Sequence, residues 1–406
     1  MKIVVRKIDL KIIALVAGLF IGVLIIEIAL RIVASTDRSN YQTFRNAPRL
    51  LGGKPSHFND YLQPSPFPDL VYELVPNVKG DQLSEYYQRP ITINADGMRD
   101  RAFQIPKPPG VFRVAVLGDS IVFGWGVGDE ENFPKLLERY LNAAAQPGAR
   151  FEVLNFGVPG YNTAMEATQY ERKGRKYGAD VVLIQSVEND RDLPNFLARK
   201  RDPWSLRRSF LLDRLRGIPL TRELFDAPET NDMEGRAHFA FPSDQYPEEF
   251  RALWGDEAVE RAMGRIAQSA REDGAAFAQV VAPTDLKPGH FQTRTAQPDE
   301  LAEFLDLGKK CGCRQIDSTA DIVDAVNEFG LKPEQLWVWP WDKHPNEVGH
   351  RIIAWSLLRR LKDLGLLKGR VVDDLGAVEA TYRAEVSEWM KVPAWQDRDR
   401  AKGVER

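Results

Sequence analysis

The sequence predicts an α/β fold in which helices cover both faces of a parallel sheet. Three observations lead to it: short apolar runs of strand type recur along the chain, helical patterns separate them, and turn residues follow them. Strands that alternate with helices form parallel sheets, because each crossover helix packs on one face of the sheet. With 406 residues, 43% of them apolar, the chain can bury at least one sizeable core.

The predicted sheet has about five strands, each a short apolar run that ends at a turn. The runs are residues 113–117, 151–156, 179–186 and 275–282, with a shorter one near 315–317. Apolar residues at three- and four-residue spacing predict the helices between and after them. The predicted helices cover 133–145, a segment from Thr163, 257–272, 299–310, 347–361 and about 375–390.

The N-terminus carries an apolar segment long enough to cross a bilayer. Residues 12–34 would form a helix of roughly 34 Å, interrupted only by Glu27 and Arg31, which lie four apart on one helix face and can pair. Basic residues crowd the segment before it, which favours a cytoplasmic N-terminus and places everything after residue 35 on the other side. A cleaved signal peptide is the alternative, although Val33-Ala34-Ser35 is a poor cleavage site.

These patterns divide the chain into four parts. Residues 1–35 are the cytoplasmic start and anchor, and 36–110 are an irregular or short-stranded extension, with a turn at 94–97, that packs on the core. Residues 111–365 form the main domain, in which the alternation of strands and helices stops in an insertion at about 196–255. Residues 366–406 are a mostly polar tail.

Composition excludes several classes of protein. A net charge of -3 offers no phosphate-tracking surface, so we expect no nucleic-acid partner. Cys311 and Cys313 are too close together for an unstrained disulfide, and we interpret them as packing residues. The acidic residues Glu188, Asp190 and Asp192 are interpreted as a solvated loop, not as a metal site. No cofactor or metal is expected.

The candidate chemistry begins at a Gly-Asp-Ser triplet that ends at Ser120, directly after the first predicted strand. A serine there has its hydroxyl exposed above the sheet and its amide at a helix start, where backbone donors are unpaired. Such a position suits a nucleophile whose tetrahedral intermediate needs nearby positive dipoles. A triplet of this kind is common in turns, so a helix cap is the plainer interpretation of Ser120.

Three further segments also follow predicted strands or precede a helix. The turn 155–160 is rich in glycine, and Asn189 follows the third strand. Asp342 and His344 lie directly before the helix predicted at 347–361. In open parallel sheets the loops beyond the carboxyl ends of the strands carry the reactive groups, so we expect these segments to meet.

The four segments, in this order, resemble the motif blocks of the SGNH or GDSL-type hydrolase superfamily, over about residues 113–360. The segments 27–31, 72–77 and 93–99 also look like those of a bacterial membrane-anchored group within it. The resemblance implies a three-layer αβα fold with a flavodoxin-like sheet. It also implies that Ser120 is the nucleophile, His344 its base and Asp342 the acid that orients the imidazole. The oxyanion hole would consist of the amides of Ser120 and Gly157 and the side chain of Asn189.

Two departures from the family pattern concern the site. Val187 and Glu188 stand where a glycine usually precedes the oxyanion asparagine. Asp342 is two residues before His344 rather than three, which works only if the segment is extended, because residues i and i+2 then point to one side.

The sequence therefore predicts a serine-nucleophile ester hydrolase or O-acyltransferase that is anchored in a membrane and acts outside the cytoplasm on acylated carbohydrate. Alternatives are a lipase or thioesterase of the same superfamily, if the insertion forms an apolar lid, and a non-catalytic polysaccharide-binding scaffold. The acceptor and the acyl group stay open.

Overall fold

The computed structural model describes residues 10–36, 61–67, 69–82, 88–192, 204, 209–212, 252–283, 305–339 and 342–391. Most of the predicted insertion at 196–255 lies outside these residues. The domain boundaries predicted from the sequence stay predictions.

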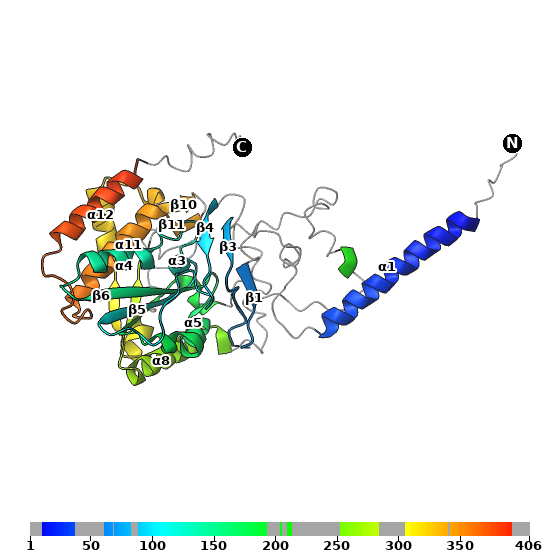
Figure 1. The fold of residues 1–406 in the computed structure, drawn as a ribbon, viewed down its shortest axis with the longest axis horizontal. Helices are drawn as coiled ribbons and strands as arrows, with labels where there is room; N and C mark the ends of the chain where they lie inside the picture. Colours follow the sequence, from blue (N-terminus) through cyan, green and yellow to red (C-terminus); the bar gives the residue numbers. More distant parts are fainter. Residues whose placement is uncertain are drawn as a thin grey trace.

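The sheet is parallel and has the expected five strands (Figure 1). They are β5 (Val111–Gly118), β6 (Arg150–Gly157), β7 (Val181–Gln185), β8 (Ala276–Val281) and β9 (Arg314–Asp317). Their order is β6-β5-β7-β8-β9, so β5 is flanked on both sides and the chain reverses direction across it. This is the flavodoxin-like order, and it places a crevice beside the carboxyl end of β5. The predicted fold class is confirmed.

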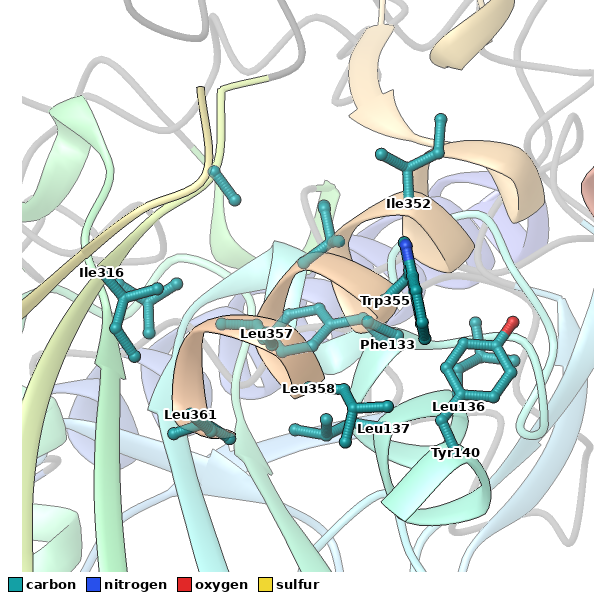
Figure 2. Close-up of a cluster of buried hydrophobic side chains, with 14 of the residues drawn as sticks. Phe133, Leu136, Leu137, Tyr140, Ile316, Ile352, Trp355, Leu357, Leu358 and Leu361 are labelled. Atoms are coloured by element: carbon teal, nitrogen blue, oxygen red, sulfur yellow. The ribbon is translucent and has the colours of Figure 1, made fainter. Parts of the chain in front are cut away.

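Helices cover both faces of the sheet, because alternate strand residues point to opposite sides. Along β5, Ala115 and Leu117 belong to one buried cluster, whereas Val114 and Val116 belong to the other. The first cluster includes α5 (Thr163–Gln169) and α8 (Asp256–Glu272). The second, part of which Figure 2 shows, includes α4 (Phe133–Ala143), α10 (Thr319–Glu328), α11 (Glu347–Asp363) and α12 (Gly376–Trp389).

Two of these helices, α5 and α11, begin at an asparagine whose side chain caps the helix. The Asn162 side chain accepts from Met165 N and starts α5, and the Asn346 side chain accepts from Val348 N and starts α11. Both caps satisfy amides that a helix start leaves unpaired. They fix the points at which the chain leaves the carboxyl side of the sheet.

The extension before the sheet forms two short hairpins that sequence analysis did not resolve. They are β1 (Leu62–Pro64) with β2 (Tyr72–Leu74) and β3 (Lys79–Gln82) with β4 (Gln88–Thr92), both antiparallel. Their apolar side chains join the cluster of α5 and α8. A third hairpin, β10 (Trp337–Trp339) with β11 (Asp342–Pro345), precedes α11.

The N-terminal helix α1 (Leu10–Thr36) projects away from the sheet (Figure 1). Within the described residues, Ala14–Val33 is the one stretch long and apolar enough to cross a membrane, a test that a signal sequence would also pass. The predicted pair forms, with Arg31 Nη2 2.7 Å from Glu27 Oε1. Glu27 also accepts hydrogen bonds from Ser209 Oγ, Phe210 N and Leu211 N.

Candidate active site

Ser120 is the first residue of α3 (Ser120–Phe123), directly beyond the carboxyl end of β5, which lies between β6 and β7. The turn is tight: a Cβ at Gly118 would lie 2.2 Å from Val122 Cγ2. The carboxylate of Asp119 caps the helix by accepting from Ile121 N at 3.1 Å. The local sequence therefore turns the chain at once, and the serine hydroxyl stands above the end of the sheet.

His344 reaches Ser120 from the other end of the chain. It lies on β11, where the hairpin with β10 and the cap at Asn346 fix its backbone. The distance between Ser120 Oγ and His344 Nε2 is 2.7 Å, across 224 residues of sequence. A hydrogen bond of this length allows a proton to pass from the hydroxyl to the imidazole.

Asp342 completes the group from the same strand. Its Oδ1 hydrogen-bonds His344 Nδ1 and also accepts from His344 N at 3.1 Å. The segment is extended, as the two-residue spacing requires, and the acid and the histidine therefore share one side of the strand. The Oδ2 atom accepts from Trp125 Nε1 at 3.1 Å, and the Trp125 ring lies 5.9 Å from the imidazole.

Gly157 lies beside Ser120 but does not fit the predicted role of an oxyanion donor. Its N–H donates to Asn155 Oδ1 at 2.9 Å in a buried position, so the amide already has an acceptor. A Cβ at this position would lie 2.1 Å from Phe123 N, so the glycine is needed because the backbone of α3 passes against it. The structure therefore corrects the prediction: packing explains this glycine.

A second glycine of the same turn was missed in the sequence. Gly160 has a φ of +75°, which favours glycine, and no described residue accepts a hydrogen bond from its N–H. The same holds for the N–H of Ser120 among the described residues. The turn is tied to the extension, because Tyr72 Oη donates to Pro159 O at 3.1 Å and Tyr161 Oη donates to Tyr72 O at 2.5 Å.

Asn189 lies within reach of the nucleophile turn. It belongs to a short 3-10 turn after β7, Glu188–Arg191, and its side chain lies near the Asp119 carboxyl, where it partly offsets the rise in pKa that burial causes. Asp190 in this turn is 1% exposed and accepts from Val187 N at 3.0 Å. The interpretation of this acidic segment as a solvated loop is therefore wrong for Asp190, whose buried carboxylate accepts a backbone hydrogen bond of the turn.

A buried carboxyl lies beneath these groups. Glu166, on the first turn of α5, is 0% exposed, and neither of its oxygens has a hydrogen-bond partner among the described residues. Burial, together with repulsion from Asp190 and Asp119, holds the pKa of Glu166 well above its usual range. Burial also raises the pKa of Asp119. The uncharged form of Glu166 is therefore favoured.

The remaining candidate residues are structural. His350 is 0% exposed and accepts from Phe133 N at 3.1 Å through Nδ1, and burial holds its pKa well below its usual range. Cys311 and Cys313 are free thiols, as predicted. No cluster of His, Cys, Asp or Glu within the described part of the chain could hold a metal ion.

Comparisons with solved structures return proteins of low identity. An α/β hydrolase from the metagenome of Lake Arreo is 18% identical, with 63% of this chain and 96% of that one covered and a TM-score of 0.39. An acetylxylan esterase from Geobacillus stearothermophilus is 15% identical, with coverages of 62% and 94% and a TM-score of 0.37. A lipase/acylhydrolase from Enterococcus faecalis is 14% identical, with coverages of 62% and 96% and a TM-score of 0.36. At these values none indicates a substrate for this chain.

No curated protein matches the chain. The family of GDSL-like lipases/acylhydrolases matches residues 116–352, more than half of its length. The matched segment runs from the strand before Ser120 to the helix after His344, so it contains every residue of the site described above. The chain belongs to the GDSL-like lipase/acylhydrolase family and is an ester hydrolase by that membership.

Proposed function

We propose that the chain is a serine-nucleophile esterase or O-acyltransferase that acts on acylated carbohydrate outside the cytoplasm. The contact of 2.7 Å between Ser120 Oγ and His344 Nε2 is the observation that carries the catalytic part of this proposal. A scaffold that had lost catalysis would have no need to keep that geometry, and this argues against the non-catalytic alternative.

In the proposed mechanism Ser120 Oγ attacks the ester carbonyl while His344 Nε2 takes its proton. Asp342 holds the imidazole in the tautomer that leaves Nε2 free to accept, and it stabilises the imidazolium. The protonated histidine then donates to the leaving alcohol, which departs and leaves an acyl-enzyme. Water or a sugar hydroxyl, deprotonated by His344, attacks that ester and releases Ser120.

The tetrahedral oxyanion would be stabilised by three donors. We assign the N–H of Ser120, the N–H of Gly160 in place of Gly157, and the side-chain amide of Asn189. The Asp119 carboxylate lies near the Asn189 side chain and would help to hold that amide in place. Preorganised donors of this kind stabilise the transition state because they need no rearrangement during the reaction.

The membrane anchor is part of the proposal. The basic residues before α1 favour a cytoplasmic N-terminus and an exported sheet domain. The three hydrogen bonds from residues 209–211 to Glu27 favour a retained anchor, because cleavage near residue 35 would remove their acceptor. A mature N-terminus near residue 35, determined by sequencing, would overturn this assignment.

Labelling with a serine-reactive phosphonate tests the catalytic assignment. The wild type is expected to be labelled, and the Ser120→Ala variant is not. Labelling that persists in the variant would remove Ser120 as the nucleophile. Turnover of a short aryl acetate, with and without an added acetyl-accepting oligosaccharide, then separates hydrolysis from transfer: a transferase gives acetylated oligosaccharide, and a hydrolase gives acetate alone.

A further inference from the structure

Arg99 lies in the extension, and every N–H of its guanidinium donates a hydrogen bond. It is 1% exposed, and Nε donates to Asp129 Oδ1 at 2.9 Å. Its other four N–H bonds go to backbone carbonyls. They are Phe123 O at 3.1 Å, Gly124 O at 2.7 Å, Pro90 O at 2.9 Å and Val127 O at 2.7 Å. A guanidinium has five N–H donors, so each one has an acceptor.

Two of these carbonyls lie at the end of the helix that begins with Ser120. The last carbonyls of a helix have no partner within it, and α3 is a single turn, so an external donor has a large share in holding it. The guanidinium also lies over the Phe123 ring, 4.8 Å from its centroid. Because Ser120 and Phe123 share that one turn, Arg99 restrains the orientation of the nucleophile without touching it.

The other carbonyls extend this restraint to the acid. Arg99 holds Gly124 O and Val127 O, on both sides of Trp125, and Trp125 donates to Asp342. The next residue, Asp100, accepts from Asn155 N at 3.0 Å and so holds the strand that leads into the glycine turn. The segment that follows Ser120 and the end of β6 therefore both meet one dipeptide of the extension, Arg99-Asp100.

We infer that Arg99 is a positioning residue for the Ser120–His344–Asp342 group, and that the extension thereby completes the active site of the sheet domain. This role rests on the proposed function. Lysine cannot replace Arg99, because one ammonium group cannot reach five acceptors in a planar fork. The inference predicts that substitution slows the chemical step while substrate binding is retained.

The chain contains a matched control at the opposite end of β5. Arg113 is 0% exposed and donates to Glu152 Oε2 at 2.8 Å, Tyr177 O at 2.8 Å and Gln104 O at 2.7 Å. Like Arg99 it joins the extension to the core through a buried guanidinium. It lies near the amino end of β5, whereas Ser120 follows the carboxyl end. Because both arginines are buried and join the extension to the core, a loss of stability that is purely structural should be similar in Arg99→Lys and Arg113→Lys.

The experiment compares Arg99→Lys with Arg113→Lys in the full chain, below the melting temperature of both. For each variant we would measure the melting temperature, the rate of phosphonate labelling at Ser120, and kcat and KM for an aryl acetate. Both melting temperatures are expected to fall. Labelling and kcat are expected to fall by about 10- to 100-fold in Arg99→Lys only, because small displacements of reacting groups cost that much. KM should stay near the wild-type value.

Equal losses of labelling per folded molecule in the two variants would overturn the inference, as would wild-type labelling in Arg99→Lys. If Arg99→Lys does not fold, Asp129→Asn replaces it, because Asp129 is partly exposed and the substitution removes the charged partner that orients the Arg99 guanidinium. A fall in kcat at constant KM is expected there, and an unchanged kcat with a lowered melting temperature would count against the role. Ser120→Ala runs in parallel: an unlabelled wild type would instead overturn the proposed function, and the inference with it.

Discussion

The two ends of the parallel sheet treat buried charge differently. Near the amino ends of the strands charged groups are paired: the buried Arg113 with Glu152 at 2.8 Å, and the half-buried Asp180 with Lys107 at 2.6 Å and with Arg113 N at 2.7 Å. Such pairs satisfy the groups that folding removes from water. This end of the sheet serves stability.

The carboxyl ends carry polar groups that lack such pairing. Glu166, Thr163 and Gln185 are 0% exposed, and side-chain oxygens of all three have no hydrogen-bond partner among the described residues. Asp119 and Asp190 are buried close enough to Glu166 to raise its pKa. Buried groups of this kind lower stability and concentrate at functional sites. This fold therefore separates the end of the sheet that stabilises it from the end that carries the candidate active site.

The largest effect should come from the carboxyl end. Ser120→Ala and His344→Ala are each expected to lower kcat by about 10⁴- to 10⁶-fold, and the double variant by no more than either alone, because the two residues act as one unit. Hydrolysis of an aryl acetate measures this. If the double variant instead loses activity by the product of the two single losses, Ser120 and His344 do not act in one step. The assignment of catalysis to the carboxyl end of the sheet would then be contradicted.

The amino end should respond in stability. Glu152→Gln leaves the Arg113 guanidinium without its buried counter-charge and is expected to lower the free energy of unfolding by about 3 kcal/mol. Urea denaturation measures this change. The kcat/KM of the folded fraction should stay within about twofold of the wild type, since the site lies at the other end of the strands. A large loss of activity without a loss of stability would break the proposed separation of roles.

Asn189 tests the oxyanion assignment. Asn189→Ala is expected to lower kcat by about 10²- to 10³-fold with a small change in KM, because the amide acts on the charge that forms in the transition state. Asn189→Asp is the matched control, since it keeps the size and replaces the donor with an acceptor. Retention of activity in both variants would place the donor elsewhere.

The smallest expected effect concerns Glu166 and the way the free energy of unfolding changes with pH. Its pKa in the folded chain lies above the value of 4.5 expected when unfolded, so the folded state keeps a proton that the unfolded state releases. Its contribution to stability is therefore complete below pH 4.5 and is lost as the pH rises from there towards the folded-state pKa. Glu166→Gln cannot ionise and should lose less stability between pH 5 and pH 6, by at most about 1.4 kcal/mol. Denaturation at several pH values measures this for wild type and variant. If both lose the same stability between pH 5 and pH 6, Glu166 does not cause the predicted pH-dependent loss.

The strands and the turn that carries Ser120 could be predicted because their signals are local. The run 113–117 is apolar, short and followed by Gly118, and it lies within β5. The short hairpins could not be predicted, since strands of three to five residues, such as β2 and β4, are too short for a period to show. The pairing of Asp342 with His344 was predictable only under the assumption of an extended segment, which β11 confirms.

The role of Gly157 and the burial of Arg99 were not predictable, because both depend on distant partners. A glycine in a turn signals a close approach but does not say which chain approaches, and here it is the backbone of α3. In the sequence Arg99 stands out only as part of the segment 93–99, through its resemblance to the family. Its acceptors extend from Pro90 to Asp129 and converge only after the extension has packed on the sheet domain.

The contact between Glu27 and the segment at 209–211 implies an order of assembly. Ser209 follows Glu27 by 182 residues, so α1 is complete long before its partner leaves the ribosome. Arg31, four residues after Glu27, is made within the same helix and can cover the carboxylate during that interval. By the time Ser209 is synthesised, β5, β6 and β7 already exist. The contact between α1 and residues 209–211 can therefore form only after the first three strands of the sheet have been synthesised.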